Sequence, residues 1–196
     1  MQGLVGGMTV EANIRVSRIG RAPVAIPSGV SASVKEQVVT VKGKLGELSH
    51  TVHPSVKVLV DGGNVLLSVE GDHRSIRALH GLSRALIQNM VVGVATGYEK
   101  KLNLVGVGYR ASVVGTNLKL EVGKSHEVLI PFPAGVTAEV SKKQDEVVLR
   151  CIDKQVLGQF AADVIRQRPV EPYKGKGIRH AGQIVKLKAG KKAGRK

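Results

Sequence analysis

The run Val65-Leu66-Leu67-Ser68-Val69, followed by apolar residues at helical spacing from Ile76 to Met90, decides the fold of this chain. The run is short and aliphatic and lies between turn-forming residues, which is typical of a β-strand. Beyond it the apolar positions recur every three or four residues, which predicts an amphipathic helix. Asp72 is placed to cap the start of this helix, and Gly93 is placed to follow its end.

The same pattern of strand and helix occurs again about 80 residues later. Val147-Val148-Leu149 corresponds to Val65-Leu66-Leu67, and Asp153 opens a second helical pattern that continues to Ile165. In both copies, short aliphatic runs separated by turn residues precede the last strand. A repeated order of elements indicates an internal duplication. The sequence therefore predicts an α+β fold of two duplicated small domains, each an antiparallel β-sheet packed with one α-helix.

Changes in composition divide the chain into four predicted segments. Residues 1–16 are small and polar, which predicts a flexible N-terminal extension. Residues 17–95 form the first α+β domain and residues 96–170 form the second. Residues 171–196 form a basic C-terminal segment and tail, and the last of them lack the apolar content needed to fold alone.

The charge of the chain is strongly positive and unevenly distributed. The net charge is +15 and the pI is near 10.2. Residues 166–196 hold eleven Lys and Arg against one acid, whereas the preceding 165 residues hold nineteen basic and fourteen acidic groups. Such an excess indicates nucleic acid or an anionic membrane surface as the partner. No apolar run approaches the roughly 18 residues that a membrane span needs, so we expect no membrane insertion.

The most basic motif is Glu171-Pro172-Tyr173-Lys174-Gly175-Lys176-Gly177-Ile178-Arg179-His180. Pro172 disfavours a continuing helix here, because proline lacks the amide donor and restricts the residue before it. On an extended backbone the alternation of Lys and Gly would point Lys174 and Lys176 the same way. A solvated basic loop without a ligand is the alternative interpretation of this run.

The other residues of the motif are suited to an anionic, base-containing ligand. Gly175 and Gly177 carry no side chain, so phosphate groups could approach the backbone amides. Tyr173 supplies a ring and Arg179 a planar guanidinium, which stack on bases or bind phosphate oxygens. The motif therefore suits an anionic ligand bound through phosphates, amides and stacking, as an alternative to a solvated loop.

The sequence offers little for catalysis or metal binding. Cys151 is the only cysteine, so an intrachain disulfide and a thiolate metal cluster are excluded. The six histidines are scattered, and the acids lie among basic neighbours rather than as a catalytic pair. We therefore predict no catalytic residue, no metal and no cofactor. An RNA-processing enzyme, a DNA-compacting protein and a membrane-surface protein are the other classes considered.

Two long blocks of the sequence resemble a known family. Glu171 to Ile178 and Lys100 to Ala111 are similar to signatures of the large-subunit ribosomal protein L-six family. Shorter similar blocks are Ser17–Gly20, Gly43–Leu48, Asn89–Val94 and Asp153–Gln155. Val170 departs from the family pattern, which often has proline at this position. The run His80-Gly81-Leu82 and the Lys/Ala/Gly-rich end resemble cyanobacterial or plastid members.

The resemblance implies a structural, non-enzymatic constituent of the large ribosomal subunit. Such a protein would bind large-subunit ribosomal RNA near the sarcin–ricin loop and the factor-binding (GTPase) centre, and would stabilise the RNA fold for translation. Its partners would be that RNA and neighbouring large-subunit proteins, with translation factors nearby and with no membrane or small-molecule substrate. Its location would be the ribosome, in a plastid (chloroplast) stroma or a bacterial cytoplasm. The matching RNA-binding positions are Tyr173, Lys174, Gly175, Lys176, Gly177 and Arg179, followed by Lys100, Lys101 and Arg110.

Overall fold

The computed structural model of the protein describes residues 17–71 and 73–191. The predicted flexible extension 1–16 and the predicted helix cap Asp72 lie outside the described residues. The chain divides into two compact units. Of the described residues, unit 1 holds those up to Gly43 and those between Glu47 and Val91, and unit 2 holds Lys44–Gly46 and those from Val92 to Lys191.

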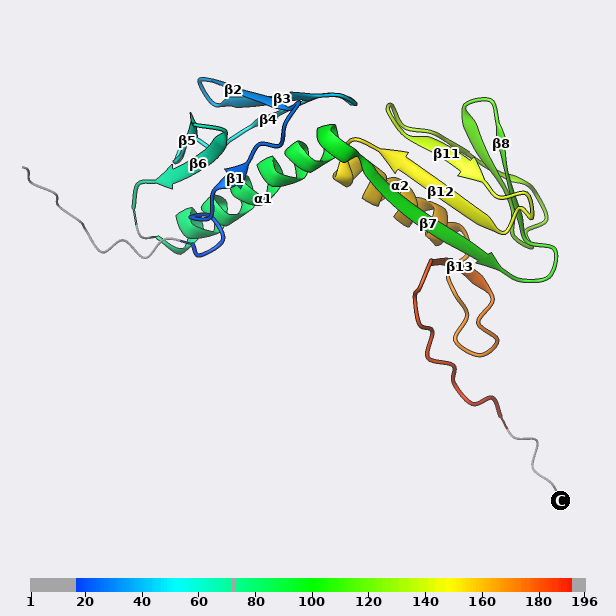
Figure 1. The fold of residues 1–196 in the computed structure, drawn as a ribbon. Coiled ribbons are helices and arrows are strands. Elements are labelled where there is room, and N and C mark those ends of the chain that lie inside the picture. Colours follow the sequence, from blue (N-terminus) through cyan, green and yellow to red (C-terminus); the bar gives the residue numbers. More distant parts are fainter. Residues whose placement is uncertain (1–16, 72, 192–196) are drawn as a thin grey trace, which may run out of the picture. The chain divides into compact units, whose positions relative to one another are not determined.

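Unit 1 is built from short strands followed by one long helix (Figure 1). Its elements are β1 (Val24–Ala25), β2 (Ser31–Lys35), β3 (Val38–Gly43), β4 (Gly46–Thr51), β5 (Val56–Asp61), β6 (Asn64–Val69) and α1 (Arg74–Thr96), whose last residues belong to unit 2. The strands form two three-stranded sheets, in the orders β1-β6-β5 and β2-β3-β4. Along β6 every second residue, namely Val65, Leu67 and Val69, is buried. This alternation places one face of the sheet in the core, as the strand period of two requires.

Unit 2 repeats this plan and adds one strand. Its elements are β7 (Tyr98–Val105), β8 (Arg110–Val114), β9 (Asn117–Glu121), β10 (Val128–Pro131), β11 (Thr137–Val140), β12 (Glu146–Cys151), α2 (Lys154–Gln167) and β13 (Gly177–His180). The strands form a three-stranded sheet β10-β9-β8 and a four-stranded sheet β11-β12-β7-β13. Helix α2 packs against β12, β7 and β13 of the larger sheet. Its apolar face joins both sheets in one core around Leu102, Leu149, Leu157 and Ile178.

The order of elements confirms the predicted α+β fold with two duplicated domains. In each unit a strand (β1 or β7) is followed by a three-stranded sheet, then by a hairpin and a helix. The hairpins β5–β6 and β11–β12 are antiparallel, and β1 and β7 pair antiparallel with the second strand of the hairpin. The strand β13 has no counterpart among the described residues of unit 1.

One of the predicted helix boundaries is confirmed and another is wrong. Asp153 caps α2, because its carboxylate accepts a hydrogen bond from the Gln155 amide at 2.7 Å. Gly93, by contrast, does not follow α1 but lies within it, and the helix ends at Thr96 before Gly97 with φ +76°. A Cβ at Gly93 would lie 2.1 Å from the carbonyl oxygen of Ile152. This glycine therefore permits close backbone packing rather than ending the helix.

Candidate nucleic-acid interface

The strand β13 attaches the basic C-terminal motif to the core of unit 2. It pairs antiparallel with β7, so that Ile178 lies opposite Leu104 and Arg179 opposite Asn103. The Ile178 side chain is 0 % exposed, and its amide donates to the carbonyl of Arg168 at 2.9 Å. The sequence pattern does not predict this strand. The pairing of β13 with β7 fixes the positions of the residues before and after β13 relative to the sheet.

The residues Glu171–Lys176, here named the cationic loop, form a closed loop immediately before β13. The Glu171 amide donates to the Lys176 carbonyl at 2.8 Å, and the Gly175 amide donates to the Glu171 carbonyl at 3.0 Å. The amide of Lys188 donates to the carbonyl of Pro172 at 2.8 Å, which holds the following segment against the loop. Residues 172–174 form a turn. The predicted extended backbone with Lys174 and Lys176 in alternation is therefore wrong.

The two glycines of the motif have packing roles in the loop. Gly175 and Gly177 are both buried, and the Gly175 amide is already bonded to Glu171. Gly177 has φ +140°, and a Cβ there would lie 2.7 Å from the Pro169 carbonyl oxygen. The expectation that phosphate approaches the Gly175 amide is therefore wrong. These glycines shape the loop from within, because a side chain would strain the backbone at either position.

The charged side chains of the motif remain accessible. Lys174 and Lys176 are exposed, Arg179 is half-buried, and the Tyr173 side chain is 53 % exposed. Among the residues that the structure describes, none of these three cations forms a salt bridge. Three uncompensated cations and one aromatic ring are thus presented from a hydrogen-bonded loop and its strand, which suits an anionic ligand with stacked bases.

The second predicted group of cations is only partly brought near the cationic loop. Lys101 lies on β7, and its carbonyl accepts from the amide of Ala181 just after β13. Lys100 points to the other side of β7, where its Nζ lies 3.7 Å from the Cβ position of Gly158 on α2. Arg110 begins β8 in the other sheet, opposite Glu121. Only Lys101 is therefore placed beside the basic motif by these contacts.

Comparison with known proteins decides the family. The model of the family described as ribosomal protein L6 matches residues 26–97 and 105–181, which covers both duplicated halves and the cationic loop. The chain belongs to the ribosomal protein L6 family. It is 50 % identical over 177 residues to a large ribosomal subunit protein uL6 of Ralstonia pickettii, covering 90 % of this chain and 99 % of that one. A uL6 protein of Caulobacter vibrioides is 51 % identical with the same coverage.

A third relative, the uL6 protein of Carboxydothermus hydrogenoformans, is 46 % identical over 180 residues, covering 92 % of this chain and 98 % of that one. These three relatives are bacterial. Membership of the ribosomal protein L6 family confirms the prediction that the chain is not an enzyme. No helix among residues 17–71 and 73–191 is long and apolar enough to cross a membrane.

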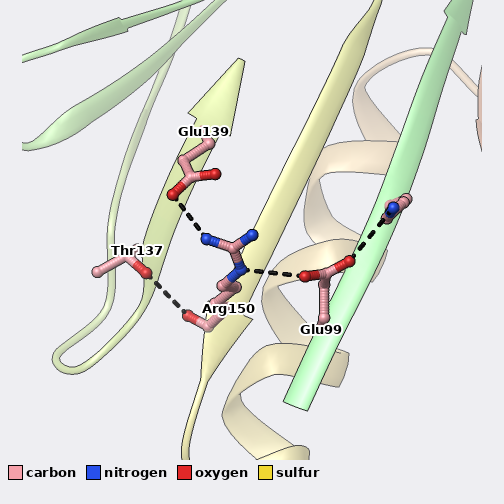
Figure 2. A network of polar contacts seen from close by, with 5 residues as sticks. Glu99, Thr137, Glu139 and Arg150 are labelled. Atoms are coloured by element: carbon pink, nitrogen blue, oxygen red, sulfur yellow. Dashed lines mark hydrogen bonds and ion pairs between the residues drawn. The ribbon is translucent and has the colours of Figure 1, made fainter. Parts of the chain in front are cut away.

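A row of paired charges crosses the sheet of unit 2 in this L6-family chain (Figure 2). The Arg150 guanidinium donates to Glu139 at 2.6 Å and to Glu99 at 3.0 Å, and Lys101 lies 3.4 Å from the other oxygen of Glu99. The hydrogen bond from Arg150 is the main cause that lowers the pKa of Glu99, and the same bond raises the pKa of Arg150. Lys101 is therefore already partly neutralised, unlike the cations of the cationic loop.

This row of charges predicts a contribution to stability that depends on pH. The pKa of Glu99 is lowered in the folded state, so its carboxylate stabilises the fold above the unfolded pKa, and the stabilisation is lost as pH falls through the folded pKa. We expect the Glu99→Gln variant to lose less thermal stability than the parent between pH 7 and pH 3. Glu36→Gln is the control, since Glu36 has no salt bridge among the described residues. An equal decrease in melting temperature from pH 7 to pH 3 for the parent and Glu99→Gln would contradict the expectation.

Proposed function

We propose that the protein is a structural constituent of the large ribosomal subunit that binds large-subunit ribosomal RNA through the cationic loop and β13. The single observation that supports this most directly is the loop itself. Its backbone is closed by its own hydrogen bonds, while Lys174 and Lys176 remain exposed without acidic partners among the described residues. A preorganised loop loses little conformational entropy on binding, and unpaired cations can displace counterions from phosphates.

The contacts follow from the placement of the side chains. Lys174, Lys176 and Arg179 would bind phosphate oxygens, and Tyr173 would stack on an exposed base. Gly175 and Gly177 would contribute by letting the loop and strand pack closely, so that RNA reaches the flanking side chains. Lys101 would add a weaker contact, because Glu99 competes with phosphate for its ammonium group. Lys100 and Arg110 would serve as peripheral phosphate contacts.

The RNA site we propose is the region near the sarcin–ricin loop and the factor-binding (GTPase) centre, where the protein would stabilise the RNA fold. Neighbouring large-subunit proteins would be further partners, and translation factors would act nearby. The relatives named "large ribosomal subunit protein" support the ribosome as the location. That ribosome would lie in a bacterial cytoplasm or in a plastid (chloroplast) stroma. The segment boundaries at residues 16, 95 and 170 stay predictions, which limited proteolysis would test.

The test is RNA binding by a variant with both exposed loop lysines removed. We expect Lys174→Ala combined with Lys176→Ala to weaken binding to an RNA fragment that contains the sarcin–ricin loop. Loss of two phosphate contacts would reduce the slope of log affinity against log salt by about two. The measurement is filter binding at several KCl concentrations.

The matched control removes two other exposed lysines of unit 2. Lys142 and Lys143 lie in the turn between β11 and β12, and neither forms a salt bridge among the described residues. Lys142→Ala combined with Lys143→Ala changes the net charge equally, and we expect it to leave the affinity and the salt slope near the parent values. Equal losses for both double variants would mean that only total charge matters, and the proposed site would be wrong.

A further inference from the structure

The turn Ser17–Arg21, here named the arginine turn, is a built feature of unit 1 that the proposed function does not use. The Arg21 amide donates to the Ser17 carbonyl at 3.1 Å, and the Ala22 amide donates to the Ile19 carbonyl at 3.1 Å. The Ser17 hydroxyl accepts from the Gly20 amide at 3.3 Å. Three hydrogen bonds within a few residues therefore fix the backbone that carries Arg18 and Arg21.

Helix α1 holds the arginine turn in place. Gly20 is buried against the ring of His80, and a Cβ on Gly20 would lie 2.4 Å from that ring. His80 is 2 % exposed, and its Nε2 donates to the carbonyl of Leu67 at 3.2 Å, so the ring is itself attached to β6. Gly81 leaves room for the Ser17 hydroxyl, which lies 3.1 Å from the Cβ position of Gly81. The turn is thus packed on two successive helix residues.

A third anchor comes from an arginine of the helix. The Arg84 guanidinium donates to the carbonyl of Ala22 at 3.2 Å and to the carbonyl of Pro23 at 3.4 Å. These bonds use two nitrogens of the Arg84 guanidinium to position the chain that follows the turn. Arg84 is therefore a positioning residue, whereas Arg18 and Arg21 have exposed side chains.

The two segments that build this turn and its support are rich in arginine and poor in acids. The stretches Ser17–Val30 and Arg74–Thr96 contain five arginines and no Asp or Glu. Elsewhere in unit 1, Lys42 forms a salt bridge with Glu47, and Lys57 forms one with Glu70. Among the described residues, neither Arg18 nor Arg21 forms such a pair. Acidic residues therefore neutralise two strand lysines of unit 1, whereas the charges of Arg18 and Arg21 remain available to bind an anionic ligand.

We propose that the arginine turn is a second RNA-binding site, at which Arg18 and Arg21 bind backbone phosphates. This inference rests on the proposed function in one respect: a chain already bound to ribosomal RNA through unit 2 would meet further phosphates. Arginine suits this role because its planar fork binds phosphate oxygens in pairs. A membrane surface suits the turn less well, because surface binding needs a broad apolar face and Ile19 is the single large exposed apolar residue of the turn, at 60 % exposed.

The test compares charge-removing variants of the full chain on deproteinised bacterial large-subunit ribosomal RNA. Arg18→Gln combined with Arg21→Gln should reduce the salt slope by about two and the affinity at 0.15 M salt roughly tenfold. The control is Lys142→Gln combined with Lys143→Gln, which removes the same charge from two exposed lysines that form no salt bridge among the described residues. It should leave the slope near the parent value. Circular dichroism should show both variants folded.

A second measurement follows the guanidinium groups directly. Phenylglyoxal modifies accessible arginines, and bound RNA should protect Arg18 and Arg21 in the parent. Protection should persist in the Lys174→Ala/Lys176→Ala chain at concentrations that restore binding, because the two sites belong to different units. A Gly20→Ala variant should lower both protection and affinity without any loss of charge, since its methyl group would displace the turn from His80.

The outcomes separate this inference from the proposed function. If the lysine variant weakens RNA binding and the arginine variant does not, the second site is wrong and the proposed function stands. If the arginine variant alone weakens binding, unit 1 carries the RNA site and the proposed loop is wrong. Equal losses from the arginine variant and its lysine control would overturn a localised site. The second RNA site would also be wrong if anionic vesicles or an acidic ribosomal protein protected Arg18 and Arg21 and RNA did not.

Discussion

Replacing Ile178 by alanine is expected to destabilise unit 2 by roughly 2–5 kcal/mol, as truncation of a buried aliphatic side chain does. Ile178 is 0 % exposed and lies in the core with Leu102 and Leu157. Its truncation removes favourable packing and leaves a cavity between β13 and α2, which are in contact. Urea unfolding followed by circular dichroism measures the loss of free energy of unfolding.

The same substitution should also weaken RNA binding, although it removes no polar group. The side chain anchors β13, and β13 positions both Arg179 and the cationic loop. The matched control is Ile184→Ala, because Ile184 is 90 % exposed and its truncation should change stability by less than about 0.5 kcal/mol. Equal destabilisation by the two substitutions, or full RNA affinity in Ile178→Ala, would show that β13 does not hold the motif.

The sequence was sufficient to predict the duplicated fold, because the spacing of apolar residues indicates which positions are buried. Aliphatic runs such as Val65–Val69 and Val147–Ile152 alternate with turns and become β6 and β12. Asp153 was recognisable as the start of the second helix because an apolar helical pattern follows it directly. Gly93 was misinterpreted because its role depends on the carbonyl of Ile152, which is distant in sequence. Local rules contain no information about such a contact.

The candidate site was predicted by residue type more successfully than by conformation. Lys174 and Lys176 are exposed, as the sequence suggested, but the backbone that carries them is a closed loop rather than a strand. The strand begins only at Gly177, and four residues are too few for a clear pattern. The aliphatic residue Ile178 between Gly177 and Arg179 was the available signal in the sequence. The ion pair between Glu99 and Arg150 could not be foreseen, because Arg150 lies on another strand and is distant in sequence.

Gly177→Ala is the other substitution with a large expected effect, about 3 kcal/mol of destabilisation. Part of this arises from φ +140°, a conformation that strains any residue with a Cβ by about 1–3 kcal/mol. The rest arises because the new methyl carbon would lie 2.7 Å from both the Pro169 carbonyl oxygen and the Val170 Cα. These are backbone atoms that cannot rotate away. The strand β13 must then move away from Pro169 and Val170, which follow α2.

Gly175→Ala provides the matched comparison within the same loop. Its φ is +71°, which costs an alanine about 1–2 kcal/mol, and its methyl carbon would meet only the flexible side chain of Leu187 at 3.3 Å. We therefore expect Gly177→Ala to be the less stable variant in urea unfolding. Hydrogen exchange at the Ile178 amide should accelerate only in Gly177→Ala, because that amide is bonded to Arg168 across the displaced contact. A Gly175→Ala chain that is less stable than Gly177→Ala would mean that the loop, rather than the strand behind it, bears the packing constraint.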